Sequence, residues 1–361
     1  MIIKSLELDH YRNYEHLNIE FDEGINILYG NNAQGKTNIL ESIYFLGTTK
    51  SHKGSKDKDV IKFGNDEAHI RSYVKKNSID YKIDMHLRKN KSKAIAINGN
   101  QIKKASELLG ILNIILFSPE DLSIIKNSPS DRRRFMDLEL CQLDKVYLSN
   151  LSNYNKIVNQ RNILLKDIWL HPELKDTLDI WDNQLISLGS RIIERRDMFV
   201  RQLNDIINTI HQKLSGEKNE LVIEYVPNVT KDDYENKMML VREKDVRYKL
   251  TSVGPHRDDF IFMIDGIDVK KFGSQGQQRT VALSLKLSEI ELVKNITGNL
   301  PVLLLDDVLS ELDSSRQHYL LNSIGDIQTI ITCTGLDEFI NNRIHVNKVF
   351  KITNGTIINE N

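Results

Sequence analysis

One stretch of the sequence has the residue types and the spacing of a phosphate-binding loop, G-x-x-x-x-G-K-[ST]. Its residues are Gly30, Asn31, Asn32, Ala33, Gln34, Gly35, Lys36 and Thr37. The two glycines permit a tight turn that brings backbone N–H groups against phosphate oxygens. Lys36 supplies a positive charge for the β- and γ-phosphates, and the Thr37 hydroxyl is a hard oxygen that suits Mg²⁺. The stretch therefore predicts a nucleotide site.

The flanking residues predict the elements that such a loop needs. Residues 25–29, before the loop, are typical of a strand. Residues 35–46 carry apolar side chains at helical spacing, so a helix is expected to begin at the loop and to point its N-terminus at the anion.

Two neighbouring carboxylates are the next candidates for chemistry. An apolar run over residues 302–305 ends in Asp306 and Asp307, as in a buried parallel strand whose carboxyl end meets a ligand. Asp306 is expected to hold Mg²⁺, directly or through water, and Asp307 to orient and deprotonate an attacking water. A pair of aspartates that caps a helix is the alternative.

A second loop precedes a long amphipathic helix that extends beyond residue 290. Its residues are Ser274, Gln275, Gly276, Gln277 and Gln278. A Ser-x-Gly turn at a helix N-terminus is a second candidate anion site. One chain cannot easily close both loops on one γ-phosphate, whereas two chains arranged head to tail can.

Positive charge is concentrated in one segment of a chain whose net charge is only −1. Residues 50–104 contain 15 Lys/Arg and 6 Asp/Glu, a surplus of nine. A basic face for a polyanion and an ordinary solvated surface both fit this pattern. Lys50, Lys53 and Lys56, in a polar loop after the first helix, are the candidate contacts to a nucleic-acid backbone.

A second basic cluster, residues 131–134, lies at the start of a helical region. Arg132 and Arg133 are candidates for contact with DNA, and contact with a nucleotide across an interface or a solvated helical turn are the alternatives. Helical periodicity dominates from there to about residue 215, with a break near His171-Pro172, and indicates an inserted arm of two or three antiparallel helices.

The remaining segments are expected to be mainly strands. Residues 1–29 and 67–102 alternate in the manner of antiparallel strands, and Asn98-Gly99 is a hairpin signal. The loop 11–14 either packs on an adenine or is a plain turn. No apolar run reaches the ~18 residues of a membrane helix. The N-terminus lacks a secretory signal, and two distant cysteines favour reduced thiols, so a cytoplasmic protein is expected.

Together these motifs resemble an ABC-type ATPase head, the class that includes SMC proteins. Within this class the chain resembles the RecF family over essentially its whole length. Further segments carry that likeness: residues 6–14, 31–41, 118–122, 131–135, 254–259 and 306–313. The resemblance implies an α/β head with a P-loop, mixed sheets and an inserted helical arm. The expected domains are residues 1–118 (ATPase lobe with a basic antiparallel sheet), 119–216 (arm) and 217–361 (completion of the lobe).

The resemblance also implies a function. Two subunits would enclose two ATP molecules with Mg²⁺, and Ser274 and Gly276 of one chain would reach the γ-phosphate held at Lys36 of the other. The dimer would hold DNA at junctions of single and double strands, and slow, DNA-stimulated ATP hydrolysis would release it. The family works with RecO and RecR, loads RecA at single-strand gaps, and supports DNA repair, replication and the SOS response.

Two departures from the usual ABC pattern favour slow turnover. Asp307 stands where most ABC ATPases carry Glu, and residues 332–334 offer hydroxyls where a titrating His is common. Two other functions stay open: a nucleotide-gated scaffold that hardly hydrolyses ATP, and an ABC subunit that powers a transporter and does not act on DNA.

Overall fold

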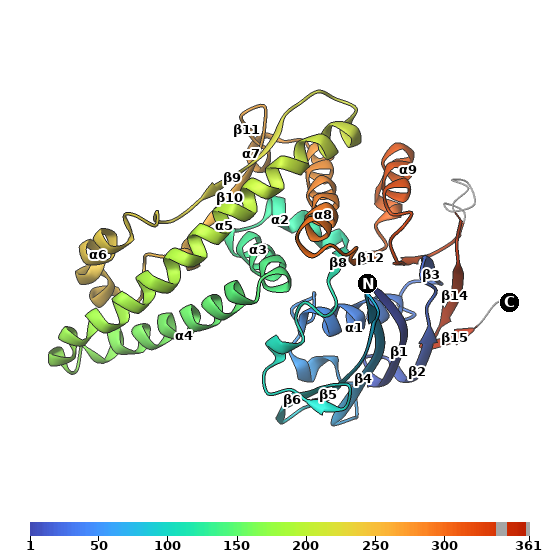
Figure 1. The fold of residues 1–361 in the computed structure, drawn as a ribbon, viewed down its shortest axis with the longest axis horizontal. Helices are drawn as coiled ribbons and strands as arrows, with labels where there is room; N and C mark the ends of the chain where they lie inside the picture. The colour runs from blue at the N-terminus through green and yellow to red at the C-terminus, as the bar shows by residue number, and fades with distance from the viewer. Residues whose placement is uncertain (337–344, 359–361) are drawn as a thin grey trace. The chain divides into compact units, whose positions relative to one another are not determined.

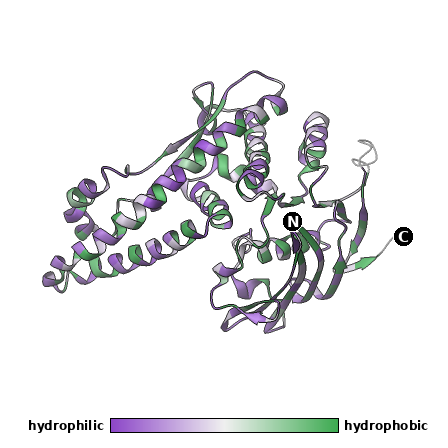
Figure 2. Cartoon of the chain, in the orientation of Figure 1, coloured by the Kyte–Doolittle hydropathy of each residue, from purple (hydrophilic) through white to green (hydrophobic). Residues whose placement is uncertain are grey.

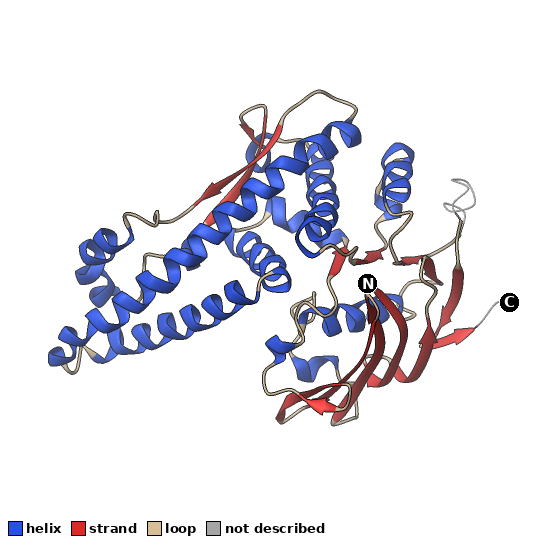
Figure 3. Cartoon of the chain, viewed as in Figure 1, coloured by secondary structure: helices blue, strands red, loops and turns tan. Residues whose placement is uncertain are grey.

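The computed structural model describes residues 1–336 and 345–358, and the chain forms two compact units. The first unit comprises residues 1–121 and 289–361, and the second comprises residues 122–288. This division differs from the expected domains. Residues 217–288, which were expected to complete the ATPase lobe, belong to the same unit as the helical arm. Figure 3 shows that the second unit is mostly helical and that the first contains most of the strands.

The first unit contains two six-stranded sheets. Its elements are β1 (Ile2–Tyr11), β2 (Tyr14–Glu20), β3 (Ile25–Tyr29), α1 (Lys36–Thr48), η1 (Asp57–Val60), β4 (Glu67–Lys76), β5 (Ile79–Arg88), β6 (Lys91–Ile97), β7 (Asn100–Gln101), η2 (Ala105–Glu107), β8 (Ile114–Phe117), η3 (Pro119–Asp121), β12 (Val302–Asp306), η6 (Leu309–Glu311), α9 (Ser314–Ser323), β13 (Thr329–Cys333), β14 (Lys348–Thr353) and β15 (Thr356–Ile358).

One of these sheets is antiparallel, in the order β2-β1-β4-β5-β6-β7 (Figure 1). Over residues 67–74 of β4 every second side chain is buried, beginning at Ala68, and the alternate side chains are exposed. This alternation places one face of the sheet on the core and leaves the other to solvent. The expectation of antiparallel strands over residues 67–102 is confirmed.

The other sheet has the order β15-β14-β3-β13-β12-β8, and all of its neighbours are parallel except the β14–β15 pair. Strand β12 is buried along its whole length, as the apolar run predicted. The helix α1 is buried on nearly all sides and shares one hydrophobic core with side chains of both sheets. The P-loop helix is therefore fixed between the two layers.

The second unit is the arm, with a small three-stranded sheet in the order β11-β10-β9. Its elements are α2 (Leu122–Lys126), α3 (Pro129–Leu143), α4 (Lys145–Asp167), η4 (Pro172–Thr177), α5 (Leu178–Ser215), β9 (Leu221–Val226), α6 (Tyr234–Tyr248), η5 (Pro255–Arg257), β10 (Asp259–Ile264), β11 (Ile267–Asp268), α7 (Val269–Phe272) and the first part of α8 (Gln275–Thr297).

The helices α4 and α5 form the long antiparallel pair of the arm, and the expected break at Pro172 lies between them. Both helices carry apolar and polar side chains in alternating bands (Figure 2), as amphipathic helices do.

Within the arm, two buried arginines form ion pairs. Arg161 contacts Asp182 and Asp245, and Arg196 contacts Asp258. None of the described helices is long and apolar enough to cross a membrane.

Candidate functional site

The P-loop follows β3 and leads into α1, as predicted. Gly30 has φ 149° and Gly35 has φ 110°, and both values favour glycine. A Cβ atom at Gly30 would lie 2.4 Å from the carbonyl oxygen of Ile352 in β14, and one at Gly35 would lie 2.5 Å from the side chain of Asn13. Both glycines are thus required by close packing as well as by the turn.

The turn between β1 and β2 braces the loop. The Tyr14 hydroxyl donates to the carbonyl oxygen of Gly35 at 3.1 Å, and the Asn13 amide donates to that of Gln34 at 3.2 Å. Arg12 does not extend into solvent, because it donates to both carboxylate oxygens of Glu41 on α1 at 2.6 and 2.7 Å. Sequence reasoning placed this turn near the nucleotide but missed that it holds the loop and its helix.

Lys36 lies inside the loop and is only 5% exposed. Its ammonium donates to the carbonyl oxygens of Gly30 and Asn31 at 2.7 and 2.9 Å. The charge is therefore held at the centre of the turn that the motif assigns to phosphate.

The predicted Mg²⁺ ligands converge although they are far apart in sequence. The Thr37 hydroxyl donates to Oδ1 of Asp306 at 2.8 Å. Thr332, on the neighbouring strand β13, donates to the same oxygen at 2.8 Å. A hydroxyl and a carboxylate at the N-terminus of a helix are hard oxygen donors suited to Mg²⁺. The parallel register, which pairs Asp306 with Thr332, produces this arrangement.

Asp307 follows β12 in a left-handed conformation, with φ 54°. Its backbone N–H donates to the Thr332 hydroxyl at 3.0 Å. A non-glycine residue in this region is strained, and such strain is common at functional sites. Burial raises the pKa of Asp307, the charge of Lys36 opposes this, and the charges of Asp306 and Glu311 add to it. A raised pKa suits a carboxylate that must accept a proton.

The second loop begins α8 and lies in the second unit. Ser274 and Gln277 form a reciprocal cap: the Ser274 N–H donates to Oε1 of Gln277 at 2.9 Å, and the Gln277 N–H donates to Oγ of Ser274 at 3.2 Å. Residues 274–276 are exposed, and a Cβ atom at Gly276 would meet only Oγ of Ser274, at 3.9 Å. Gln278 is buried instead, and its side chain donates to the carbonyl oxygen of Val269 at 3.1 Å.

The two groups of basic candidate residues differ in their exposure to solvent. Lys50, Lys53 and Lys56 are exposed in the loop after α1. Arg132 is 3% exposed and donates to both carboxylate oxygens of Asp259 at 2.6 and 2.8 Å. Arg133 is partly exposed and donates to the carbonyl oxygen of Asp258 at 2.6 Å. These contacts favour a structural role for Arg132, which the sequence alternatives did not include.

Two sheets around a P-loop helix, with paired carboxylates at the end of a parallel strand, define an ABC-type ATPase head. A family model described as RecF/RecN/SMC N terminal domain matches residues 2–358. A relative from Lachnospira eligens, DNA replication and repair protein RecF, is 62% identical over 363 residues, 100% of both chains. The chain belongs to the RecF family.

Solved structures agree with this assignment. The structure described as the recombination mediator protein RecF-ATP in the RecFOR pathway has a TM-score of 0.92 at 36% identity, covering 99% of this chain and 97% of that one. An Smc head domain from Pyrococcus furiosus has a TM-score of 0.56 at 18% identity, covering 98% and 94%. The second likeness shows the fold alone, and it confirms the α/β head expected from the motifs.

Proposed function

We propose that this chain is an ATP-dependent, DNA-binding recombination mediator of the cytoplasm. The observation that carries the proposal is the meeting of Thr37 and Asp306 at 2.8 Å beside the P-loop lysine. Residues 30–37 would hold the ATP phosphates, and Thr37 and Asp306 would hold Mg²⁺. The similar structure described as RecF-ATP supports this assignment.

Hydrolysis would use groups of this chain in separate roles. Lys36 would stabilise negative charge on the phosphates, and Asp307 would orient and deprotonate the water. The aspartate is one methylene shorter than glutamate, and its backbone is held at Thr332. Both features favour slow turnover, in keeping with a clamp that stays closed for long periods.

The complete site would need a second copy of the chain. Ser274 and Gly276 are exposed at the start of α8, where backbone N–H groups favour an anion. A head-to-tail dimer would bring this loop to the ATP held at Lys36 of the other copy, so dimerisation would depend on ATP. DNA would contact the exposed Lys50, Lys53 and Lys56, and RecO- and RecR-type proteins are the proposed partners.

The test is binding to a gapped DNA duplex at physiological salt, with and without ATP, alongside sedimentation to follow the dimer. Binding and dimerisation that both require ATP support the clamp. Ser274→Arg, which places a bulky cation in the exposed loop, is expected to abolish both while ATP binding to the monomer persists. DNA binding that is equal with and without ATP would overturn the proposal.

A nucleotide-gated scaffold is the second candidate, and the short carboxylate of Asp307 favours it. Steady-state ATP turnover with and without DNA separates the two. DNA-stimulated turnover supports the hydrolysing clamp, whereas ATP-dependent dimerisation without measurable turnover supports the scaffold.

A further inference from the structure

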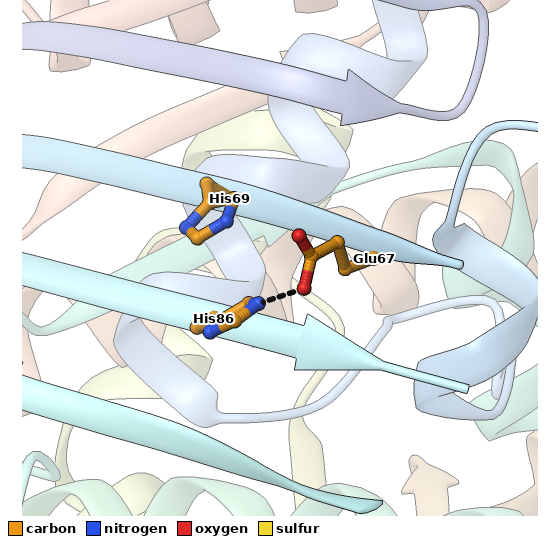
Figure 4. A group of neighbouring side chains, drawn as sticks. All are labelled: Glu67, His69 and His86. Carbon is orange, nitrogen blue, oxygen red and sulfur yellow. Dashed lines mark hydrogen bonds and ion pairs between the residues drawn. The ribbon is translucent and has the colours of Figure 1, made fainter. Parts of the chain in front are cut away.

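The solvent face of the antiparallel sheet carries a cluster of metal-ligand side chains, away from the P-loop motif. Glu67 and His69 are two residues apart on β4, so both point to the same face. His86 lies on β5 directly opposite His69 in the register. Figure 4 shows the three side chains gathered on one face of the two strands.

The donor atoms of these side chains are close together. Nε2 of His86 and Oε2 of Glu67 are 2.8 Å apart, and the rings of His69 and His86 stack with centroids 4.0 Å apart and planes 19° apart. One ligand atom from each residue lies within 4.8 Å of the others. Rotation about χ2, which is soft for histidine, can therefore direct both rings at one ion.

Space for an ion and its water adjoins the cluster. A hollow of about 340 Å³ is lined by both histidines, and β6 contributes the small side chains of Ala94 and Ala96 to it. Asp9, also on its wall, pairs with His69 in the β1–β4 register. Metal-bound histidines commonly donate their other ring N–H to a carboxylate, and Asp9 is placed for that role.

We propose that Glu67, His69 and His86 form a binding site for one Zn²⁺ ion, with water completing the coordination. Two imidazoles and a carboxylate are a known donor set for zinc with an open fourth position. Mg²⁺ and Ca²⁺ prefer oxygen donors, so millimolar Mg²⁺ does not occupy this site. The ion joins β4 to β5 on the solvent face of the sheet.

The experiment is titration of the full-length, chelator-treated protein with Zn²⁺ in the presence of excess Mg²⁺ and without nucleotide. A zinc-binding dye serves as competitor, and Co²⁺ absorption provides a second readout of coordination. One ion per chain is expected. His69→Gln and His86→Gln are each expected to weaken binding by about tenfold or more. All three proteins should have the same melting temperature without metal, because the side chains are on the surface.

His171→Gln is the matched control, since His171 is also an exposed histidine that contacts a carboxylate, Glu173, at 3.3 Å, but it belongs to the other unit. This variant is expected to bind Zn²⁺ nearly as tightly as the unchanged protein. The site is refuted if the unchanged protein binds no Zn²⁺, or if His69→Gln and His86→Gln bind it as well as His171→Gln does. In the latter case the ion resides elsewhere, for example at a cysteine.

Discussion

Arg12 and Glu41 form a bidentate ion pair that joins the turn between β1 and β2 to the P-loop helix α1. The guanidinium Nε and Nη2 lie 2.7 and 2.6 Å from the two carboxylate oxygens, and Glu41 is fully buried. The Ser51 hydroxyl also donates to Glu41, at 2.5 Å. The turn, the helix and the lysine loop are therefore connected through one carboxylate.

Arg12→Met is expected to destabilise the protein by about 3–5 kcal/mol, because it leaves the buried Glu41 carboxylate without its cation. Urea denaturation at pH 7 measures the change. Lys4→Met breaks an exposed ion pair with Asp80 and should leave the midpoint of urea denaturation nearly unchanged, because solvent screens exposed pairs. Equal losses in the two variants would contradict the importance assigned to the Arg12–Glu41 pair.

Lys36→Met is expected to weaken ATP binding by about 10- to 100-fold, since a charge-assisted contact to phosphate contributes about 1.5–3 kcal/mol. Fluorescent ATP titration measures the loss, and ATP-dependent dimerisation should disappear with it. Lys53→Met, a change in the nearby exposed loop, should leave ATP binding intact. Normal dimerisation of Lys36→Met would show that the nucleotide is bound elsewhere.

Asp307→Asn is expected to slow ATP turnover by about 10²- to 10⁴-fold and to trap the ATP-bound dimer, because the amide cannot accept a proton. Single-turnover hydrolysis and sedimentation measure the two effects. The pKa of Asp307 is raised in the folded chain. As the solution is acidified, turnover by the unchanged protein should therefore begin to fall at a higher pH than it would if the base were an ordinary aspartate. Rapid turnover by Asp307→Asn would remove this residue from the role of base.

Replacing both Lys53 and Lys56 with Met should make DNA affinity less dependent on salt. Each lost phosphate contact lowers the slope of log affinity against log salt by about 0.9. Fluorescence anisotropy at several salt concentrations measures it. Lys89→Met is the control, because Lys89 is paired with Asp66 at 3.0 Å. An unchanged slope in the double variant would place the DNA contacts on another surface.

His256 should make the arm sensitive to acid. Its Nε2–H donates to the carbonyl oxygen of Thr251 at 3.0 Å, and its Nδ1 accepts from the Tyr154 hydroxyl at 2.8 Å, which requires a neutral ring. Burial lowers the pKa of His256 from 6.5 to about 4. As pH falls, His256 is protonated in the unfolded chain before it is protonated in the folded chain. The contribution of the neutral ring to the free energy of unfolding is therefore complete above pH 6.5 and is lost as pH falls toward 4, by about 3 kcal/mol in total.

His256→Gln should therefore lose less stability between pH 7 and pH 5 than the unchanged protein does, as measured by urea denaturation at each pH. His171→Gln, at an exposed histidine of the same unit, should lose as much as the unchanged protein. If the two variants respond alike, the acid sensitivity arises from other groups.

The sequence predicted the elements whose function depends on short, contiguous motifs. The P-loop, the buried strand ending at Asp306, and the antiparallel strands are read from local spacing and alternation. The contacts of Arg132 and Arg12 could not be predicted this way, since their partners, Asp259 and Glu41, are distant in sequence. A buried ion pair and a solvated basic turn have the same local sequence, and only the fold distinguishes them.

The histidine cluster had a weak signal in the sequence. Glu67 and His69 have the two-residue spacing of one strand face, but His86 joins them only through the β4–β5 register. The boundary between the two units could not be predicted from the sequence either. It lies at residue 288, inside α8, where the helical pattern of the sequence continues without a break.

The order of strands has a consequence for how this protein is made. β3, which carries the P-loop, lies between β13 and β14, and both of these neighbours come from the last part of the chain. During synthesis from the N-terminus, β3 therefore has no neighbour in this sheet until residues 329–333 and 348–353 have been made. The P-loop is thus among the first segments to be synthesised, whereas the strands on either side of β3 follow some three hundred residues later.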